Sequence, residues 1–385
     1  MYHRTHQNEE AREIRCGPAY YLKKTALPWL GPIFMAVGIG TYGFTGPTIQ
    51  AFNIAESAHN AFGLDKTVMG ILMAVFFGIV VLGGMRRIGS FAEYVVPFMA
   101  GVFMLLTIII LILNHARIPG MIVLIVKSAL NMEAAYGGIF GSAVSWGIRR
   151  AIYSSEAGMG SGAHAAASSE VPHPIKQGVA QASSVYYTLI ICTCTALMIL
   201  CTGMYNVSDG MGGHIVQGAH GVAEGIGYTQ AAIDTLSPGT PIGSIFIAVA
   251  IFFFAFTTLL SFGFYAAVNI AYLMGNSKYL RTVVVIVGLA QMFSIYLGST
   301  NSSALAWGIA DVGVALGAWV NLIGMIFLGG VCAKCMRDYD NQMKQGLTPV
   351  FRPRELGIEG ADLWDDIVEK HYKNINDKPA SGQEN

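Results

Sequence analysis

The sequence predicts an all-α protein that crosses a membrane several times. Hydrophobic residues make up 54% of its 385 residues, whereas charged residues make up only 12%. Several uninterrupted apolar runs reach about 20 residues, the length that a helix needs to cross about 30 Å of hydrocarbon. The 23 basic and 23 acidic residues balance, which gives a nucleic-acid partner no electrostatic support. We therefore expect the lipid bilayer, and not nucleic acid, as a partner.

The first apolar run, Leu27–Ala55, contains several glycines and the pair Gly46-Pro47. Because proline lacks an N–H group and glycine weakens a helix, the second half of this span is not expected to be a plain helix. Gln50 lies just beyond the pair, where its amide can reach an exposed polar group of a ligand.

Further apolar segments bring the expected number of spans to about eight. They are Thr67–Leu82, Tyr94–Leu113, Ala134–Ile148, Val179–Thr202, Ile242–Met274, Val283–Leu297 and Ser302–Val331. Ile118–Leu130 is apolar but short and carries Lys127, so it is expected to be an amphipathic helix in the interface. Ala223–Leu236 is expected to be a short surface helix within a long polar loop.

Lysines and arginines are distributed unevenly between alternate loops, and residues 177–277 contain none. By the positive-inside rule, the basic loops and both termini are expected to be cytoplasmic. The alternation favours a single crossing for Ser302–Val331. The expected organisation is a cytoplasmic segment 1–26, a transmembrane domain 27–333 and a cytoplasmic tail 334–385.

The stretch Ala135–Ser169 begins as an apolar segment interrupted by glycines, among them Gly137, Gly138 and Gly141. An interrupted membrane helix exposes backbone polar groups, which are tolerated only where they line a cavity or touch a ligand. We interpret this segment as a broken transmembrane helix at a binding site. Close packing of helices through small residues is the alternative. The residues from the arginine doublet to Lys176 are expected to form a cytoplasmic loop.

Asp311 is an acidic residue placed well inside a late span. An intramembrane carboxylate costs about 2.5 kcal/mol or more, which makes it a functional candidate, although a place near the outer interface or at a helix kink is the alternative. Trp307 lies one turn earlier, where it either floors a pocket on the same face or belongs to an interfacial aromatic belt.

Thr257 and Thr258 lie in the middle of an apolar span. Paired hydroxyls of this kind either help to ligate a desolvated Na⁺ or bond to their own helix. Glu156 follows Arg149 by two helical turns, so the two are expected to form an ion pair at the cytoplasmic end, with a gating or structural role.

No hydrolase, nucleotide-binding or redox motif occurs in the sequence. Cys332 and Cys335 form a lone C-x-x-C pair without a second pair or a nearby histidine, which is a weak signal for a metal. We therefore expect no enzyme, no catalytic residue, no enzymatic cofactor and no metal beyond a coupling ion.

Several motifs carry a specific family resemblance. They are GPAYYL (17–22), VPFMA (96–100), RRAIYSSEAGMGSGAHAAAS (149–168), HPIKQG (173–178), ICTCTALMIL (191–200), FAFTT (254–258), AWGIAD (306–311) and FRPRELGIEGADLW (351–364). In this order, the motifs resemble the alanine/glycine:cation symporter family, also called the sodium:alanine symporter or amino-acid carrier family. The resemblance implies a leucine-transporter-like fold of two inverted repeats that hold substrate and ion at the midplane.

The resemblance also implies that the chain is N-terminally incomplete. In the family, GPAYYL follows earlier spans, so residues 27–117 correspond to the remainder of the first repeat and residues 134–333 to the second repeat. Roles carried over by position are substrate binding for Gln50, Gly137, Gly138, Gly141 and Trp307, and Na⁺ binding for Thr257 and Thr258. Arg149, Glu156 and Asp311 remain gating or structural candidates. The chain departs from the family at Phe52, Phe262, Ala266, Ala267 and Gly308.

The expected function is sodium-coupled symport of a small neutral amino acid, with alanine or glycine as the expected substrate, by alternating access in the cell (inner or plasma) membrane. The expected partners are this amino acid, Na⁺ and the lipid bilayer. The alternative is a non-transporting membrane sensor or partner subunit derived from such a carrier.

Overall fold

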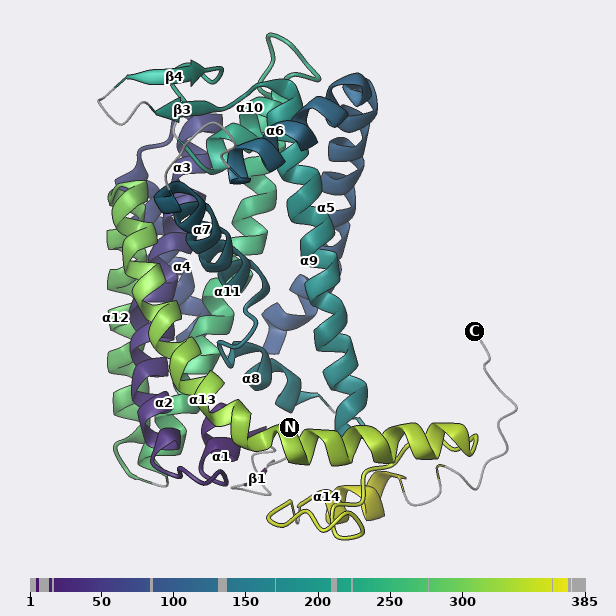
Figure 1. The fold of residues 1–385 in the computed structure, drawn as a ribbon. Helices are drawn as coiled ribbons and strands as arrows, with labels where there is room; N and C mark the ends of the chain where they lie inside the picture. Colours follow the sequence, from purple (N-terminus) through teal and green to yellow (C-terminus); the bar gives the residue numbers. More distant parts are fainter. Residues whose placement is uncertain are drawn as a thin grey trace.

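The computed structural model of the chain is an elongated bundle of helices (Figure 1). It describes residues 5–6, 14–15, 17–83, 86–130, 137–169, 171–208, 213–222, 224–275, 277–361, 363–372 and 375. Two short antiparallel ribbons accompany the helices. They pair β1 (Thr5–His6) with β2 (Ile14–Arg15), and β3 (Asn206–Ser208) with β4 (His214–Gln217).

The helices follow one another along the chain, with longer connections between α9 and α10 and between α13 and α14. In the first half they are α1 (Pro18–Leu22), α2 (Leu30–Gly40), the π-helical turn η1 (Thr41–Thr45), α3 (Gly46–Phe62), α4 (Lys66–Gly83), α5 (Arg86–Leu113), the 3₁₀ turn η2 (His115–Arg117) and α6 (Ile118–Leu130). In the second half they are α7 (Gly137–Ser155), α8 (Ser161–Ser168), α9 (Pro174–Thr202), α10 (Ile226–Asp234), α11 (Ile242–Met274), α12 (Leu280–Thr300), α13 (Ser303–Lys344), α14 (Leu363–Ile367) and the π-helical turn η3 (Val368–Tyr372).

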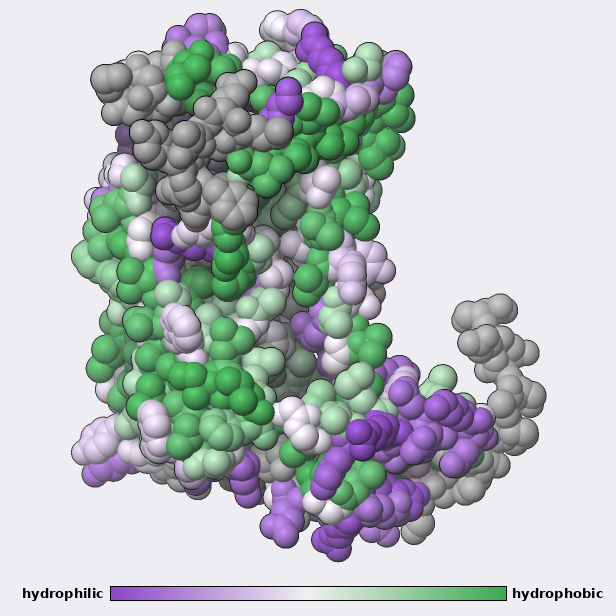
Figure 2. Space-filling model, in the orientation of Figure 1, coloured by the Kyte–Doolittle hydropathy of each residue, from purple (hydrophilic) through white to green (hydrophobic). Residues whose placement is uncertain are grey.

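Several of these helices are suited to a membrane. Among the described residues, five segments are long and apolar enough to cross it: Val96–Leu113, Pro174–Thr202, Ile242–Met274, Leu280–Thr300 and Ser303–Lys344. Lys66–Val81 is a shorter apolar helix. Figure 2 shows hydrophobic residues along the side of the bundle and hydrophilic residues gathered at its ends and on the projecting C-terminal part. The chain is therefore a predominantly helical, multi-pass membrane protein.

The first expected span is helical from Leu30 onward, but not as a plain α-helix. Helix α2 passes into α3 through η1, and Pro47 lies in the first turn of α3. The π-helical turn widens the helix just before the proline, whose missing N–H and bulky ring do not fit a regular helical interior. The expectation of an irregular second half is confirmed.

The late apolar stretch Ser302–Val331 forms one helix and not two. The structure places nearly all of it in the single continuous helix α13. The C-terminal part of α13 bends and runs away from the bundle (Figure 1). Ile118–Leu130 forms α6 with the expected bounds. The expected surface helix between Ala223 and Leu236 is the shorter α10.

The segment between the arginine doublet and Lys176 differs from the expected loop. Helix α7 continues through Arg149 and Arg150 to Ser155, and α8 follows after five residues. Alanine-rich sequence favours helix, and the tertiary contacts of α8 stabilise so short a helix in place of a loop. The interruption between α7 and α8 lies near the middle of the long axis of the bundle (Figure 1).

The core of the bundle lies where α3, α4, α11 and α12 meet. Buried apolar side chains of all four helices pack there, including Ile54, Phe77, Leu259 and Ile295. The helices approach closely at Gly298 of α12, because an added Cβ would lie 2.3 Å from the carbonyl oxygen of Thr48. Such contact of backbones through a small residue is typical of membrane helices.

Candidate functional site

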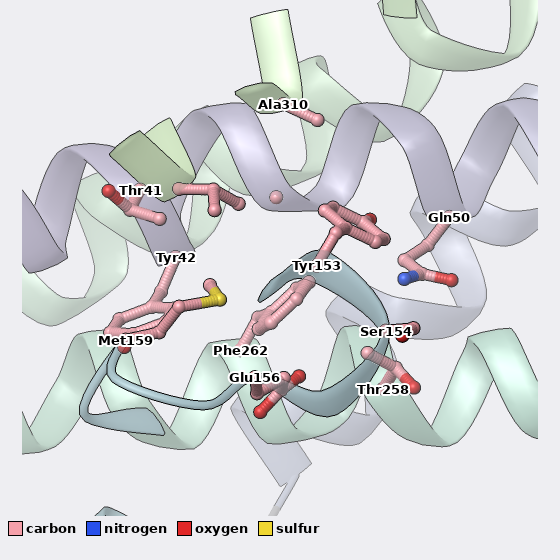
Figure 3. Close-up of a pocket in the computed structure, with 12 residues that line it drawn as sticks. Thr41, Tyr42, Gln50, Tyr153, Ser154, Glu156, Met159, Thr258, Phe262 and Ala310 are labelled. Carbon is pink, nitrogen blue, oxygen red and sulfur yellow. The ribbon is translucent and has the colours of Figure 1, made fainter. Parts of the chain in front are cut away.

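A cavity of about 210 Å³ lies beside the interruption between α7 and α8. Its walls come from the α2–η1–α3 helix, the end of α7 with the following loop, α11 and α13. The lining residues are Thr41, Tyr42, Gly46, Gln50, Tyr153, Ser154, Glu156, Met159, Thr258, Phe262, Ala310 and Val314. Figure 3 shows Gln50, Tyr153, Ser154 and Thr258 toward one end of the cavity, and Tyr42 and Met159 toward the other.

The π-helical turn η1 positions Thr41 and Tyr42 at the cavity. The Thr41 hydroxyl donates a hydrogen bond to the Gly313 carbonyl of α13 at 3.1 Å. Two side chains of α12 bond to carbonyls of the same turn: Gln291 Nε2 donates to Tyr42 O at 3.0 Å, and Ser294 Oγ donates to Phe44 O. Carbonyls that leave the regular helical pattern in a π-turn need such partners when they are buried.

Backbone geometry defines the interruption after α7. Gly158 and Gly160 both have φ of +84°, a conformation that glycine adopts without a steric penalty. Glu156 has φ of +52° and is the non-glycine residue with positive φ in the described chain, at a cost of roughly 1–3 kcal/mol. Asn321 of α13 fixes the loop by donating from Nδ2 to the Gly158 carbonyl at 2.8 Å.

An ion pair and the Trp307 indole lie behind aromatic rings that line the cavity. Arg150 Nη2 donates to both carboxylate oxygens of Asp311, at 2.6 Å each, and thereby joins α7 to α13. The Arg150 guanidinium also lies 4.2 Å from the ring centroid of Trp307, and Trp307 packs edge-on against Tyr153 with centroids 5.0 Å apart. On the opposite side, Tyr42 and Phe262 stack at 5.8 Å.

The predicted site residues fall into two groups. Gln50, Glu156 and Thr258 line the cavity, whereas Thr257 and Trp307 are not among its lining residues. Trp307 supports the cavity from behind, through Tyr153. Gly137, Gly138 and Gly141 lie in the first turns of α7, and the interruption within the described residues comes later, at residues 156–160.

The arginine that forms an ion pair is Arg150 and not Arg149. The expected pair of Arg149 with Glu156 is not among the ion pairs of the described residues. The Arg149 guanidinium lies 5.5 Å from the centroid of the Trp146 ring. Glu156 Oε2 instead accepts a hydrogen bond from Ser161 Oγ at 2.6 Å. Residues 157–160 are not helical, so they bring Ser161 of α8 back to Glu156.

Sequence reasoning missed five lining residues that carry polar or polarisable groups: Thr41, Tyr42, Tyr153, Ser154 and Met159. Two signals pointed toward them. Thr41 and Tyr42 directly precede the glycines before Pro47, whereas Tyr153 directly precedes the distinctive SSEAGMGS segment and Ser154 and Met159 lie within it. Aromatic and small residues next to a predicted break are therefore candidate lining residues, since interrupted helices line cavities.

The cavity suits a small polar ligand. Carboxamide, hydroxyl and carboxylate groups face it from Gln50, Thr258 and Glu156, and apolar walls come from Phe262, Met159 and Ala310. Its volume of about 210 Å³ is below the roughly 300–1,000 Å³ typical of pockets for drug-sized ligands. In the described residues no group of three or more histidine, cysteine, aspartate or glutamate side chains is arranged to hold a metal ion.

The multi-pass helical bundle, with a small polar cavity at an interrupted helix, defines a membrane transporter. A family model described as the sodium:alanine symporter family matches residues 1–353. The chain therefore belongs to the sodium:alanine symporter family, a family of transporters and not of enzymes, whose coupling ion is Na⁺.

Curated relatives agree with this membership. YrbD of Bacillus subtilis, named as a sodium/proton-dependent alanine carrier protein, is 43% identical over 94% of this chain and 73% of its own length. The sodium/proton-dependent alanine carrier protein of Bacillus sp. is 43% identical over 86% of this chain and 74% of its own length. The sodium/alanine symporter AgcS of Methanococcus maripaludis is 31% identical over 83% and 68%, respectively.

Proposed function

We propose that this protein carries a small neutral amino acid into the cell together with Na⁺, by alternating access, with the described cavity as the shared binding region. Alanine is the first expected substrate, and glycine the second. The observation that carries the proposal is the cavity itself, which lies where α7 is interrupted near the middle of the bundle. Several relatives named as alanine carriers or alanine symporters support the choice of substrate.

The lining residues suggest how a small amino acid is selected. The Gln50 carboxamide offers both a donor and an acceptor to the charged groups of the substrate. Phe262 and Met159 occupy the space that a larger substrate side chain would need, so the cavity favours substrates with a hydrogen or methyl side chain. Trp307 keeps Tyr153 in place and contributes to binding through it.

Thr258 is the proposed contributor to Na⁺ binding. Its hydroxyl donates to the Phe254 carbonyl at 3.0 Å, and its oxygen keeps lone pairs that are able to ligate a cation in the cavity. Thr257 makes the same bond, at 2.9 Å, on a side of α11 that does not line the cavity. The three α7 glycines remain candidates for substrate contact.

The proposal includes a leucine-transporter-like arrangement with about eight crossings, both termini cytoplasmic, and placement in the cell membrane. The single long helix α13 supports one late crossing, and the interrupted α7–α8 pair supports a broken helix in the second repeat. The expected boundaries, with a transmembrane domain at 27–333, belong to the same proposal.

Uptake into proteoliposomes containing the full chain tests the proposed function. Labelled alanine and glycine are offered with an inward Na⁺ gradient, with K⁺ or choline in place of Na⁺, and with a proton gradient alone. Alanine accumulation that requires the Na⁺ gradient is the expected result. Binding of alanine without accumulation under any gradient would contradict transport by this chain.

A further inference from the structure

Glu156 differs from two other carboxylates of the bundle. Glu56 forms an ion pair with Lys66, and Asp311 forms one with Arg150. Glu156 lines the cavity but takes part in no ion pair with any side chain that the structure describes. One neutral donor, the Ser161 hydroxyl, bonds to it at 2.6 Å. A carboxylate in the interior of a membrane protein is unfavourable without a positive partner, so the cavity holds negative charge that the described surroundings do not balance.

The backbone brings this charge to the cavity in spite of local strain. At a φ of +52°, Glu156 occupies a region that side-chain-bearing residues rarely adopt, while glycines serve the same loop at 158 and 160. A glycine at 156 would relieve the strain. A glutamate in that place is therefore consistent with a task for its carboxylate, and not only with the shape of the loop.

Neutral oxygen atoms line the cavity with the Glu156 carboxylate. Thr258 and Gln50 line the same cavity as Glu156, and Ser154 lies next to Thr258 (Figure 3). The Thr258 and Ser154 hydroxyls each donate to a carbonyl of their own helix, at 3.0 and 3.2 Å, so their oxygens remain acceptors toward the cavity. Several neutral oxygens and one carboxylate form a donor set for a hard cation or an ammonium group.

We propose that the Glu156 carboxylate is the counter-ion of a monovalent cation bound in the cavity. The inference deepens the proposed function and depends on it, because two such cations are expected there: the coupling Na⁺ and the ammonium group of the amino acid. Either cation would balance the negative charge of the Glu156 carboxylate, which the neutral Ser161 hydroxyl does not. Because Glu156 lies where the chain leaves α7, cation binding at this carboxylate acts directly on the interrupted segment between α7 and α8.

Chemical labelling tests the proposal on the unmodified full chain. A hydrophobic carbodiimide reacts with accessible carboxylates, and mass spectrometry measures the modified fraction of the Glu156 peptide against that of exposed Glu355. Labelling is compared in choline, in Na⁺ alone, and in Na⁺ with alanine. Protection of Glu156 by Na⁺ alone identifies the coupling ion as its partner, whereas protection that appears only after alanine is added identifies the ammonium group. Equal labelling in all three conditions overturns the proposal.

Glu156→Gln removes the charge but keeps the size of the side chain. We expect the affinity for one of the two cations to fall by about tenfold or more, measured as Na⁺ binding without alanine and as alanine binding at saturating Na⁺. Glu355→Gln, on a side chain that is 69% exposed, is the matched control and should bind both as the wild type does. Ser161→Ala removes the hydrogen bond and leaves the charge, so it should keep the affinity that Glu156→Gln loses.

The outcomes separate this inference from the proposed function. Wild-type affinity for both ligands in a folded Glu156→Gln protein overturns the role of Glu156 and leaves the transport proposal standing. A wild-type chain that neither binds nor transports alanine with Na⁺ overturns both. Size-exclusion profiles establish folding, and the labelling experiment decides the question if Glu156→Gln does not fold.

Discussion

At the scale of single residues, Thr257 and Thr258 show how the turn of a helix gives two adjacent hydroxyls different surroundings. Both donate to the Phe254 carbonyl, at 2.9 and 3.0 Å, so both satisfy the helix in the same way. Only Thr258 also lines the cavity. A threonine hydroxyl can therefore bond to its own helix and also ligate an ion, because a hydroxyl that donates one hydrogen bond still has acceptor lone pairs.

Thr258→Val should raise the Na⁺ concentration needed for half-maximal alanine uptake by roughly tenfold, because an oxygen ligand is replaced by a methyl group of similar size. Thr257→Val loses the same helix bond without changing the cavity, so it should shift this concentration by much less. The measurement is uptake as a function of Na⁺ concentration at fixed alanine. Equal shifts in the two variants would remove Thr258 from the ion site.

Trp307→Ala should weaken alanine binding by roughly tenfold, although the indole does not line the cavity. The reason is that Trp307 packs against Tyr153, which does line it, and lies 4.2 Å from the Arg150 guanidinium. A binding titration measures the effect. Trp319→Ala, on the same helix but with a side chain that is 69% exposed, is the control and should bind normally. Unchanged affinity in Trp307→Ala would show that Tyr153 does not need this support.

At the scale of the elements, the interruption between α7 and α8 is the feature on which the cavity depends. An added Cβ at Gly160 would lie 2.9 Å from both the Phe34 ring and Pro18, and the backbone there has φ of +84°. Position 160 therefore requires glycine for two independent reasons, conformation and space. The absence of a side chain at Gly160 lets Pro18 of α1 and Phe34 of α2 pack closely against the loop that carries Glu156.

Gly160→Ala should destabilise the folded protein by roughly 1–3 kcal/mol and lower its apparent melting temperature in detergent. Gly120→Ala in α6 is the matched comparison, since its Cβ meets nothing within 4 Å and alanine is the better helix former, by up to about 1 kcal/mol. That variant should melt at or above the wild-type temperature. A fall in both variants, or in neither, would contradict the steric account of Gly160.

At the scale of the whole molecule, the C-terminal region is docked onto the end of the bundle. Phe351 and Trp364 are buried beside Cys335 of α13 and Ile175 of α9, and Phe351 N donates to the Pro172 carbonyl at 3.0 Å. His173 joins the same contact: its Nε2 lies 3.2 Å from Asp338 Oδ2, and its ring packs against Phe351 at 5.4 Å. Its Nδ1 accepts from Ile175 N and so caps α9.

Docking of the C-terminal region should weaken as the pH falls below about 6.5. Burial lowers the pKa of His173 below its ordinary value, and this effect outweighs the Asp338 carboxylate. When the region undocks, the imidazole returns to a pKa near 6.5, so the undocked form binds more protons in acid and docking is strongest above that pH. Limited proteolysis between residues 344 and 368, from pH 7.5 to 5.5, measures the effect. His173→Asn keeps a capping group without a titrating ring and should abolish the pH dependence, and an unaltered dependence would exclude His173.

The helices were the most predictable part of this protein. Ile118–Leu130 and the apolar core of α11 follow from the length and composition of their segments, because the bilayer leaves a helix few alternatives. The extent of α7 and the presence of α8 did not follow. The charged and glycine-containing residues around Arg149–Gly162 indicated a loop, whereas contacts of α7 and α8 with neighbouring helices, among them α1, α9 and α13, stabilise helices on both sides of the break.

The candidate site was predicted in part for the same reason. Gln50 and Thr258 stand next to a recognisable break and a recognisable pair of hydroxyls, and both line the cavity. The partners of Glu156 and Asp311 did not follow from spacing along one helix. Glu156 bonds across the interruption to Ser161, and Asp311 bonds to Arg150, which is distant in sequence.

The class of this protein, a helical membrane transporter of the sodium:alanine symporter family, follows from its residues alone, because hydrophobic length and specific motifs are properties of the chain. Which polar groups share the cavity, and which carboxylate there has no described basic partner, depends on how the helices pack. Hydrogen bonds and ion-pair contacts form only between atoms that lie within a few ångströms of each other. The packing of the helices and the positions of their breaks decide which groups come that close, and the order of the residues does not.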